Sequence, residues 1–168
     1  MSTKSFIINL PIITGDQDRR RLRKSFSFGC NLQNAVMGGG WDRVLRMRAT
    51  PEWQAARVMP KGSERTKAFR DLRVRFRLSE YDFHADVAKH RKASGHGHLV
   101  GINECHQKLA SRAWISVERH LYNGGFPRFI SSRRGLHSIE GKTNRTGIIW
   151  KADHAVRNRQ QARVPCSC

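Results

Sequence analysis

The residues best suited to chemistry are cations and aromatics gathered between Asn123 and Lys151. This stretch, NGGFPRFISSRRGLHSIEGKTNRTGIIWK, sets two phenylalanines around a proline and then adds paired arginines and further basic residues. Guanidinium and ammonium groups bind phosphate oxygens, and aromatic rings stack on bases. We predict an extended cationic surface that contacts a nucleic-acid backbone. Its predicted contact residues are Phe126, Arg128, Phe129, Arg133, Arg134, Lys142, Arg145 and Lys151.

The role of the two phenylalanines stays open at this point. Phe126 and Phe129 either stack on bases or act as buried anchors between a sheet and a helix. Pro127 disfavours helix at the residue before it, so the segment is predicted to be extended. Leu136 and Ile139 supply an apolar side that is typical of a strand.

The overall charge favours the same kind of partner. The 168 residues include 32 Lys and Arg against 13 Asp and Glu, a formal net charge of +19. Self-repulsion of this size destabilises a compact chain, so a polyanionic partner is the natural compensation. Nucleic acid, as RNA or DNA, is our first expectation, ahead of an anionic membrane surface or basicity that serves solubility alone. No stretch approaches the ~18 continuous apolar residues of a spanning helix, so we expect no membrane insertion.

A strongly periodic helix precedes the cationic stretch. Its apolar residues recur at intervals of three and four, which predicts one packed face. Arg112 and Arg119 lie with Lys108 on another side, where they either contact phosphates or are simply solvated. We include Arg112 and Arg119 among the predicted contact residues. The apolar stripe consists of Ile102, Cys105, Leu109, Ala113, Val117 and Leu121.

A histidine-rich loop offers a competing chemistry. His96 and His98, with Asn103 and His106 nearby, could be read as the metal site of a small nuclease. The sequence after Gly101 indicates a helix rather than the β-hairpin that such a site needs. We therefore predict no metal, no cofactor and no catalytic residues. The four cysteines form no CxxC pair, and Cys30 and Cys105 are interpreted as core residues.

Upstream, the pattern predicts a short strand and then helices. Phe6–Leu10 is rich in β-formers and ends at Pro11. A helix begins near Asp16, and its predicted inward face consists of Leu22, Phe26, Cys30, Gln33 and Met37. The three glycines 38–40 predict a turn between this helix and the next.

Capping signals predict the following helices. Thr50-Pro51 matches an N-cap followed by proline at the first helical position. A further helix is expected over Ser63–Arg73. Ser79, with an acid three residues later, predicts the start of a helix that runs to about Lys92.

Several of these segments resemble TnpB-type transposon proteins, the RNA-guided relatives of type V CRISPR effectors that are often described as transposases. The residues that carry the resemblance are GGFPRF with the basic stretch after it, FIINLP near the start, and FGC followed by Asn34. PEWQAARVMPKGSERTKAFRDLRVRF, LSEYDFHADVAKHRK and HQKLASRAW are similar to segments of an actinobacterial branch. The resemblance covers roughly Phe6 to Lys151.

The resemblance implies an α+β fold. It would comprise a mostly α-helical bundle and a small, incomplete wedge-type β-barrel made by the N-terminal strand and the C-terminal strands. Residues 1–13 would form the first strand, 14–122 the helical recognition-type region, 123–151 the returning strands, and 152–168 a divergent, disordered tail. A separate protein or segment would complete the barrel. Family members hold guide RNA and the guide–target heteroduplex with these parts.

The chain departs from the family after Lys151. The separated acids of a RuvC-like nuclease domain and its zinc-binding cysteines have no counterpart in the sequence ADHAVRNRQQARVPCSC. We therefore expect a truncated nucleic-acid-binding fragment without nuclease activity. Two alternatives stay open: a small metal-dependent nuclease that uses the histidine-rich loop, and a decayed gene product without function. Met1–Leu10 is too short and polar for a secretory signal, so a cytoplasmic location is expected.

Overall fold

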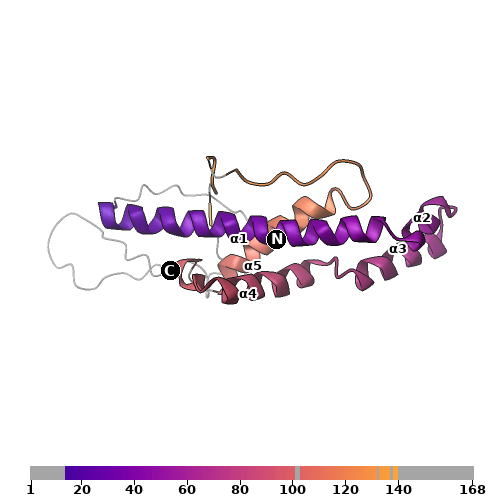
Figure 1. Cartoon of the computed structure of the whole chain (residues 1–168), viewed down its shortest axis with the longest axis horizontal. Helices are drawn as coiled ribbons and strands as arrows, with labels where there is room; N and C mark the ends of the chain where they lie inside the picture. The colour runs from indigo at the N-terminus through magenta and orange to yellow at the C-terminus, as the bar shows by residue number, and fades with distance from the viewer. Residues whose placement is uncertain (1–13, 101–102, 132, 137, 140–168) are drawn as a thin grey trace, which may run out of the picture.

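The described part of the chain is built from helices. The structure is a computed structural model that describes residues 14–100, 103–131, 133–136 and 138–139. In order they form α1 (Asp16–Arg48), α2 (Pro51–Val58), α3 (Ser63–Arg75), α4 (Glu80–Ser94), the 3₁₀ turn η1 (Gly97–Val100) and α5 (Asn103–Glu118). Figure 1 shows α1 along the length of the molecule, with α3 and α4 running back beside it and α5 crossing obliquely. None of the described helices is both long and apolar enough to cross a bilayer.

The capping signals read from the sequence are confirmed. The Thr50 hydroxyl accepts a hydrogen bond from the Trp53 N–H, and Pro51 occupies the first turn of α2. The Ser79 hydroxyl likewise accepts from the Asp82 N–H at the start of α4. Helix α4 ends at Gly95, whose φ of 68° is the left-handed conformation that glycine adopts without strain.

The predicted turn at the three glycines is wrong, because α1 continues through them for 33 residues in all. Packing explains why glycine is needed there without a turn. A Cβ on Gly40 would lie 2.2 Å from Cζ of Phe83, a fully buried ring on α4. The missing side chain therefore allows α4 to approach α1 closely, and tertiary contact overrides the local preference of glycine for turns.

The core lies where α1, α4 and α5 meet. Val36, Met37, Val44 and Met47 of α1 are buried together with Phe83, Val87 and the predicted stripe from Cys105 in α5 to Leu121 just after it. Ile102, the first residue of that stripe, lies outside the described residues. The Phe83 and Trp114 rings meet edge to face at 5.3 Å between centroids. The inward face predicted for the first helix is confirmed at Cys30, Gln33 and Met37, which are buried, whereas Leu22 and Phe26 are only half-buried.

The expected β-barrel is the main error of the sequence interpretation. Within the residues that the structure describes there is no strand, sheet or barrel. Residues 126–131 are irregular and lie against helices, so their backbone has no strand partner among those residues. Pro127 cannot donate to a β-ladder, and Leu136 and Ile139 pack against the helical core instead of a sheet. The predicted strand Phe6–Leu10 lies outside the described residues.

Candidate anion-binding pocket

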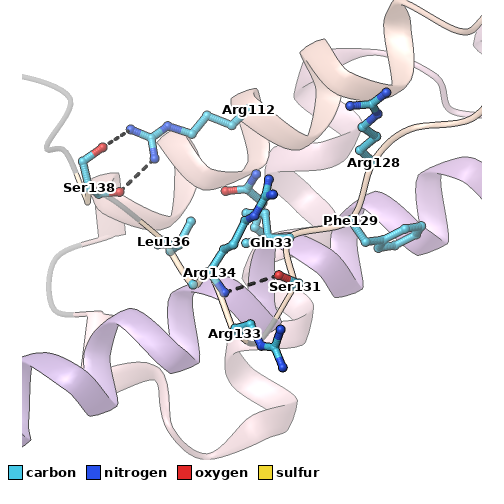
Figure 2. A pocket seen from close by; sticks show the side chains of 11 residues that line it. Gln33, Arg112, Arg128, Phe129, Ser131, Arg133, Arg134, Leu136 and Ser138 are labelled. Atoms are coloured by element: carbon cyan, nitrogen blue, oxygen red, sulfur yellow. Dashed lines mark hydrogen bonds between the residues drawn. The ribbon is translucent and has the colours of Figure 1, made fainter.

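The segment after α5 returns to the helices and, together with α1 and α5, lines an open cationic pocket. The segment comprises the described residues from Phe126 to Ile139, and we call it the returning segment. The pocket has a volume of about 880 Å³. Its lining residues come from α1, α5 and the returning segment, and none of them is acidic (Figure 2). They are Gln33, Arg112, Arg128, Phe129, Ile130, Ser131, Arg133, Arg134, Gly135, Leu136 and Ser138.

Asn34 of α1 fixes one side of the pocket. Its side-chain Nδ2 donates to the Ile130 carbonyl at 2.8 Å, and its Oδ1 accepts from the Ile130 N–H at 3.0 Å. The carboxamide thus satisfies both backbone groups of one residue, as a neighbouring strand would. This pair of hydrogen bonds explains why an extended segment lies on a helix without forming a sheet.

Arg112 of α5 fixes the other side. Its guanidinium donates to the Ser138 carbonyl at 2.8 Å and to the Ser138 hydroxyl at 3.0 Å (Figure 2). Leu136 anchors the same part of the segment by packing against α1. A Cβ added to Gly29 of α1 would lie 2.9 Å from the Leu136 Cδ1. Arg112 was predicted to contact phosphate, but in this structure both of these N–H donors bind Ser138 in the pocket wall.

Contacts just after α5 fix the course of the chain between that helix and the pocket. Arg48, near the end of α1, donates to the carbonyls of His120, Leu121 and Asn123. These carbonyls follow the end of α5 at Glu118, and a single guanidinium donates to all three. Pro127 is then fully buried, so the proline rather than either phenylalanine anchors the segment. Phe126 and Phe129 are 66% and 49% exposed, which contradicts their interpretation as buried anchors.

Three guanidiniums in the pocket are available for a ligand. The side chains of Arg128, Arg133 and Arg134 make no hydrogen bond or ion pair to any described residue. A turn presents the last two: the N–H groups of Arg134 and Gly135 both donate to the Ser131 carbonyl, at 3.1 and 2.9 Å. Gly135 has a φ of 63°, which favours glycine at this position.

Arg43, an arginine of the helical core, differs from these three because a carboxylate compensates its charge. Arg43 of α1 donates to Asp86 of α4 at 2.6 Å and covers the Phe83 ring at 5.3 Å. In this ion pair the charge of Arg43 is compensated by Asp86, and the pair links α1 to α4. The cations of the pocket instead lie beside one another, and none of the described lining residues carries a carboxylate, so the local potential from these residues is positive.

Gln33 is a polar group that the sequence did not single out as functional. Its side chain is only 8% exposed, lines the pocket and leaves Oε1 without a hydrogen-bond partner among the described residues. An unpaired buried amide oxygen costs about 1–3 kcal/mol. The sequence did not indicate this role because Gln33 lies on the buried face of α1, where it was interpreted as a packing residue.

The pocket gathers about half of the predicted contact residues. Arg112, Arg128, Phe129, Arg133 and Arg134 line it. Arg119 and Phe126 are exposed but do not line it. The predicted contacts Lys142, Arg145 and Lys151 lie outside the described residues. Sequence reasoning missed Gln33 as a lining residue, together with Ile130, Ser131, Gly135 and Ser138.

The histidine-rich loop does not assemble a metal site within the described residues. No group of three or more His, Cys, Asp or Glu side chains there is placed to hold a metal ion. His96 and His98 are exposed with ring centroids 6.3 Å apart, and His106 is buried in the core. Burial, with the nearby charges of Arg91 and His84, lowers the pKa of His106 to about 4.

A Ser–His–Glu group on α4 and α5 also has a structural role. The Ser111 hydroxyl donates to Glu80 Oε1 at 2.5 Å, and His84 Nε2 lies 3.0 Å from the same hydroxyl oxygen. Because the hydroxyl has one proton and gives it to Glu80, His84 donates to Ser111 rather than accepting from it. This is the reverse of the direction in which a histidine base activates a serine nucleophile.

Comparison with known proteins adds no relative, since no protein-family model, curated protein or solved structure matches the chain significantly. The resemblance to TnpB-type proteins therefore stays a prediction from the sequence.

Proposed function

We propose that this chain binds the sugar-phosphate backbone of a nucleic acid through the pocket between α1, α5 and the returning segment, and that it does so without catalysis. The observation that carries the proposal is the meeting of Arg128, Arg133 and Arg134 around one pocket whose wall Arg112 helps to hold, with no acidic side chain among the described lining residues. Guanidinium forks fit phosphate oxygens and keep their charge at every physiological pH.

The surroundings of the pocket favour a nucleic acid over other polyanions. Phe129 lines the pocket and keeps 49% of its surface exposed. Figure 2 shows its ring extending outward from the segment, on the side away from Arg133 and Arg134. A half-exposed ring next to phosphate-binding cations can stack on a base, for about 1–3 kcal/mol. The net charge of +19 adds long-range attraction to any strand.

The proposal keeps the part of the TnpB-type resemblance that concerns nucleic-acid binding. Its GGFPRF element contains Pro127 and Phe129, which anchor and line the pocket respectively. The β-barrel part is not retained for the described residues. The absence of a nuclease activity remains a proposal, tested by incubating the protein with single-stranded and plasmid DNA and divalent metal.

A charge-matched pair of variants tests the binding proposal. Arg133→Ala with Arg134→Ala removes two unpaired cations from the pocket. Lys61→Ala with Lys67→Ala removes two exposed cations from α3 and the turn before it, outside the pocket. Both double variants lower the net charge by the same amount, so they differ in whether the removed cations lie in the pocket.

The expected result is a loss of affinity confined to the first pair. Fluorescence anisotropy with a labelled single strand should show about 10- to 100-fold weaker binding for the pocket double, because two charge-assisted contacts are lost. The loss should be similar for unrelated sequences, since phosphate contacts carry no sequence information. Equal binding by the two doubles would contradict the proposal.

A further inference from the structure

We propose that Tyr122, Phe126 and Phe129 form a row of stacking surfaces for unpaired bases, so that the protein binds single-stranded nucleic acid in preference to a duplex. We call these three rings the stacking row. This inference rests on the proposed function and names the form of nucleic acid that the site accepts. It is carried by the exposure of the three rings, by the contacts that hold them and by the charges beside them.

The exposed rings of the structure are concentrated in one short part of the chain. Tyr122, Phe126 and Phe129 are 50%, 66% and 49% exposed. Among the described residues, Tyr81 of α4 is the one other aromatic side chain that is largely exposed. Exposed apolar side chains scattered singly over a surface need no explanation, whereas a group of them marks a binding surface. Three exposed rings so close together in the chain therefore indicate such a surface.

The part of the chain that carries the row runs back along α1 (Figure 1). Arg48 donates to the Asn123 carbonyl at 2.8 Å. Phe129 lies at Gly38, where an added Cβ would be 3.7 Å from the Phe129 Cε1. The stretch of α1 between Arg48 and Gly38 is about 15 Å long, at 1.5 Å for each residue. Consecutive phosphates of a helical strand are about 3.4 Å apart, so the row can follow several nucleotides.

The rings are held by their neighbours and remain open to solvent. Tyr122 stacks on Trp53, with the ring centroids 6.0 Å apart and the planes 11° from parallel. Pro127 is fully buried and anchors the chain between Phe126 and Phe129. Figure 2 shows the Phe129 ring extending outward from the returning segment. Rings that are fixed before binding lose little conformational entropy when a base stacks on them.

The charges beside the row favour a nucleic-acid strand over a protein partner. No Asp or Glu occurs in the sequence between Arg119 and Ile139, a stretch that contains Arg128, Arg133 and Arg134. Arg128 lies between the two phenylalanines, and its guanidinium has no partner among the described residues. Rings that stack on bases, interspersed with cations that follow the backbone, are the means by which proteins bind single strands.

The cationic pocket by itself gives no preference for a single strand. Duplex DNA has the higher charge density, so cations alone bind it at least as tightly. Within a duplex, however, the faces of each base are already stacked on neighbouring bases, and an exposed ring such as Phe126 has no base face to contact. A preference for the single strand therefore reports stacking, separately from the binding of phosphates.

The experiment compares three forms of one labelled DNA sequence: the single strand, its duplex, and a strand of the same length made of abasic nucleotides. All three supply phosphates, but only the first supplies unpaired bases. Fluorescence anisotropy at one salt concentration should show that the single strand binds about tenfold more tightly than the abasic strand, and more tightly than the duplex.

Substitutions at Phe126 connect this preference to the row, because its ring does not line the pocket. Phe126→Ala should weaken binding of the single strand about tenfold and leave the affinity for the abasic strand unchanged. Phe126→Trp keeps an aromatic face and should retain the preference, whereas Phe126→Leu is apolar without such a face and should lose most of it. Tyr81→Ala, which removes an exposed ring from α4, is the matched control and should change neither affinity.

The outcomes separate this inference from the proposed function. Equal affinities for the single strand and the abasic strand would overturn the stacking row and leave backbone binding in the pocket intact. A preference that survives Phe126→Ala, or that Tyr81→Ala reduces equally, would also overturn the row. If no strand binds, both proposals are overturned. Circular dichroism and thermal melting establish that each variant is folded.

Discussion

The helical core and the returning segment use the same residue types for opposite purposes. In the core, Arg43 is paired with Asp86 and lies over a buried ring, and glycine makes room for that ring. In the returning segment, Arg133 and Arg134 have no side-chain partner among the described residues, and Phe129 is half exposed. The core therefore derives its stability from apolar burial, whereas the segment is held by polar ties to Asn34 and Arg112 together with a few apolar contacts of Pro127, Leu136 and Ile139. A charged residue is evidence of function only when the structure leaves it uncompensated.

The largest expected effect contrasts two phenylalanines. Phe83→Ala empties a fully buried site between Trp114 and Arg43, and should lower the free energy of unfolding by about 3–5 kcal/mol. Phe129→Ala removes a half-exposed ring and should lower it by less than about 1 kcal/mol while weakening strand binding. Chemical denaturation of both variants measures the difference. Similar losses of stability would show that the returning segment belongs to the core.

A second prediction concerns the pH dependence of core stability, compared between the unmodified protein and a variant without His106. Because the pKa of His106 is about 4 in the folded protein and near 6.5 when unfolded, the unfolded chain binds more protons between these values. Stability should therefore fall as pH decreases from 6.5 to 4, with a contribution from His106 of up to about 3 kcal/mol. His106→Leu should remove this contribution. Unfolding curves measured at several pH values test it, and parallel pH dependence in the two proteins would contradict it.

The smallest expected effect on global stability comes from the tie between α1 and the segment. Asn34→Ala removes both hydrogen bonds to Ile130 and should cost about 1 kcal/mol or less in unfolding free energy. The Ile130 amide should exchange with solvent much faster, and affinity for a strand should fall. Asn34→Asp keeps an acceptor for the Ile130 N–H and should preserve part of its protection. Unchanged exchange in Asn34→Ala would show that other contacts hold the segment.

Local signals in the sequence predicted much of the helical framework. Thr50 and Ser79 indicate helix starts through capping hydrogen bonds to residues three positions later, and Pro51 does so by its place in the first turn. These signals depend on nearby residues only, so the sequence alone predicts them. The glycines at 38–40 were misread as a turn because Gly40 makes room for Phe83, more than forty residues away. A turn and a close helix contact both favour glycine, and the sequence alone does not distinguish them.

The pocket was predicted by its charges but not by its geometry. Arg133 and Arg134 stand out as a basic pair in any reading of the sequence. Asn34 and Gln33 do not, because an amide on the inner face of a helix has no partner that can be named before folding. The returning segment was assigned to a sheet because strand-like composition indicates extended backbone, not what satisfies its hydrogen bonds.

The salt dependence of binding tests the central claim most directly. For a hydroxyl-ended single strand, the logarithm of affinity falls linearly with the logarithm of salt concentration, by about 0.7 for each phosphate neutralised. The account predicts that Arg133→Ala with Arg134→Ala makes this slope shallower by about 1 to 1.5, whereas Lys61→Ala with Lys67→Ala leaves it near that of the unmodified protein. Identical slopes for the two doubles would show that the strand does not bind in this pocket.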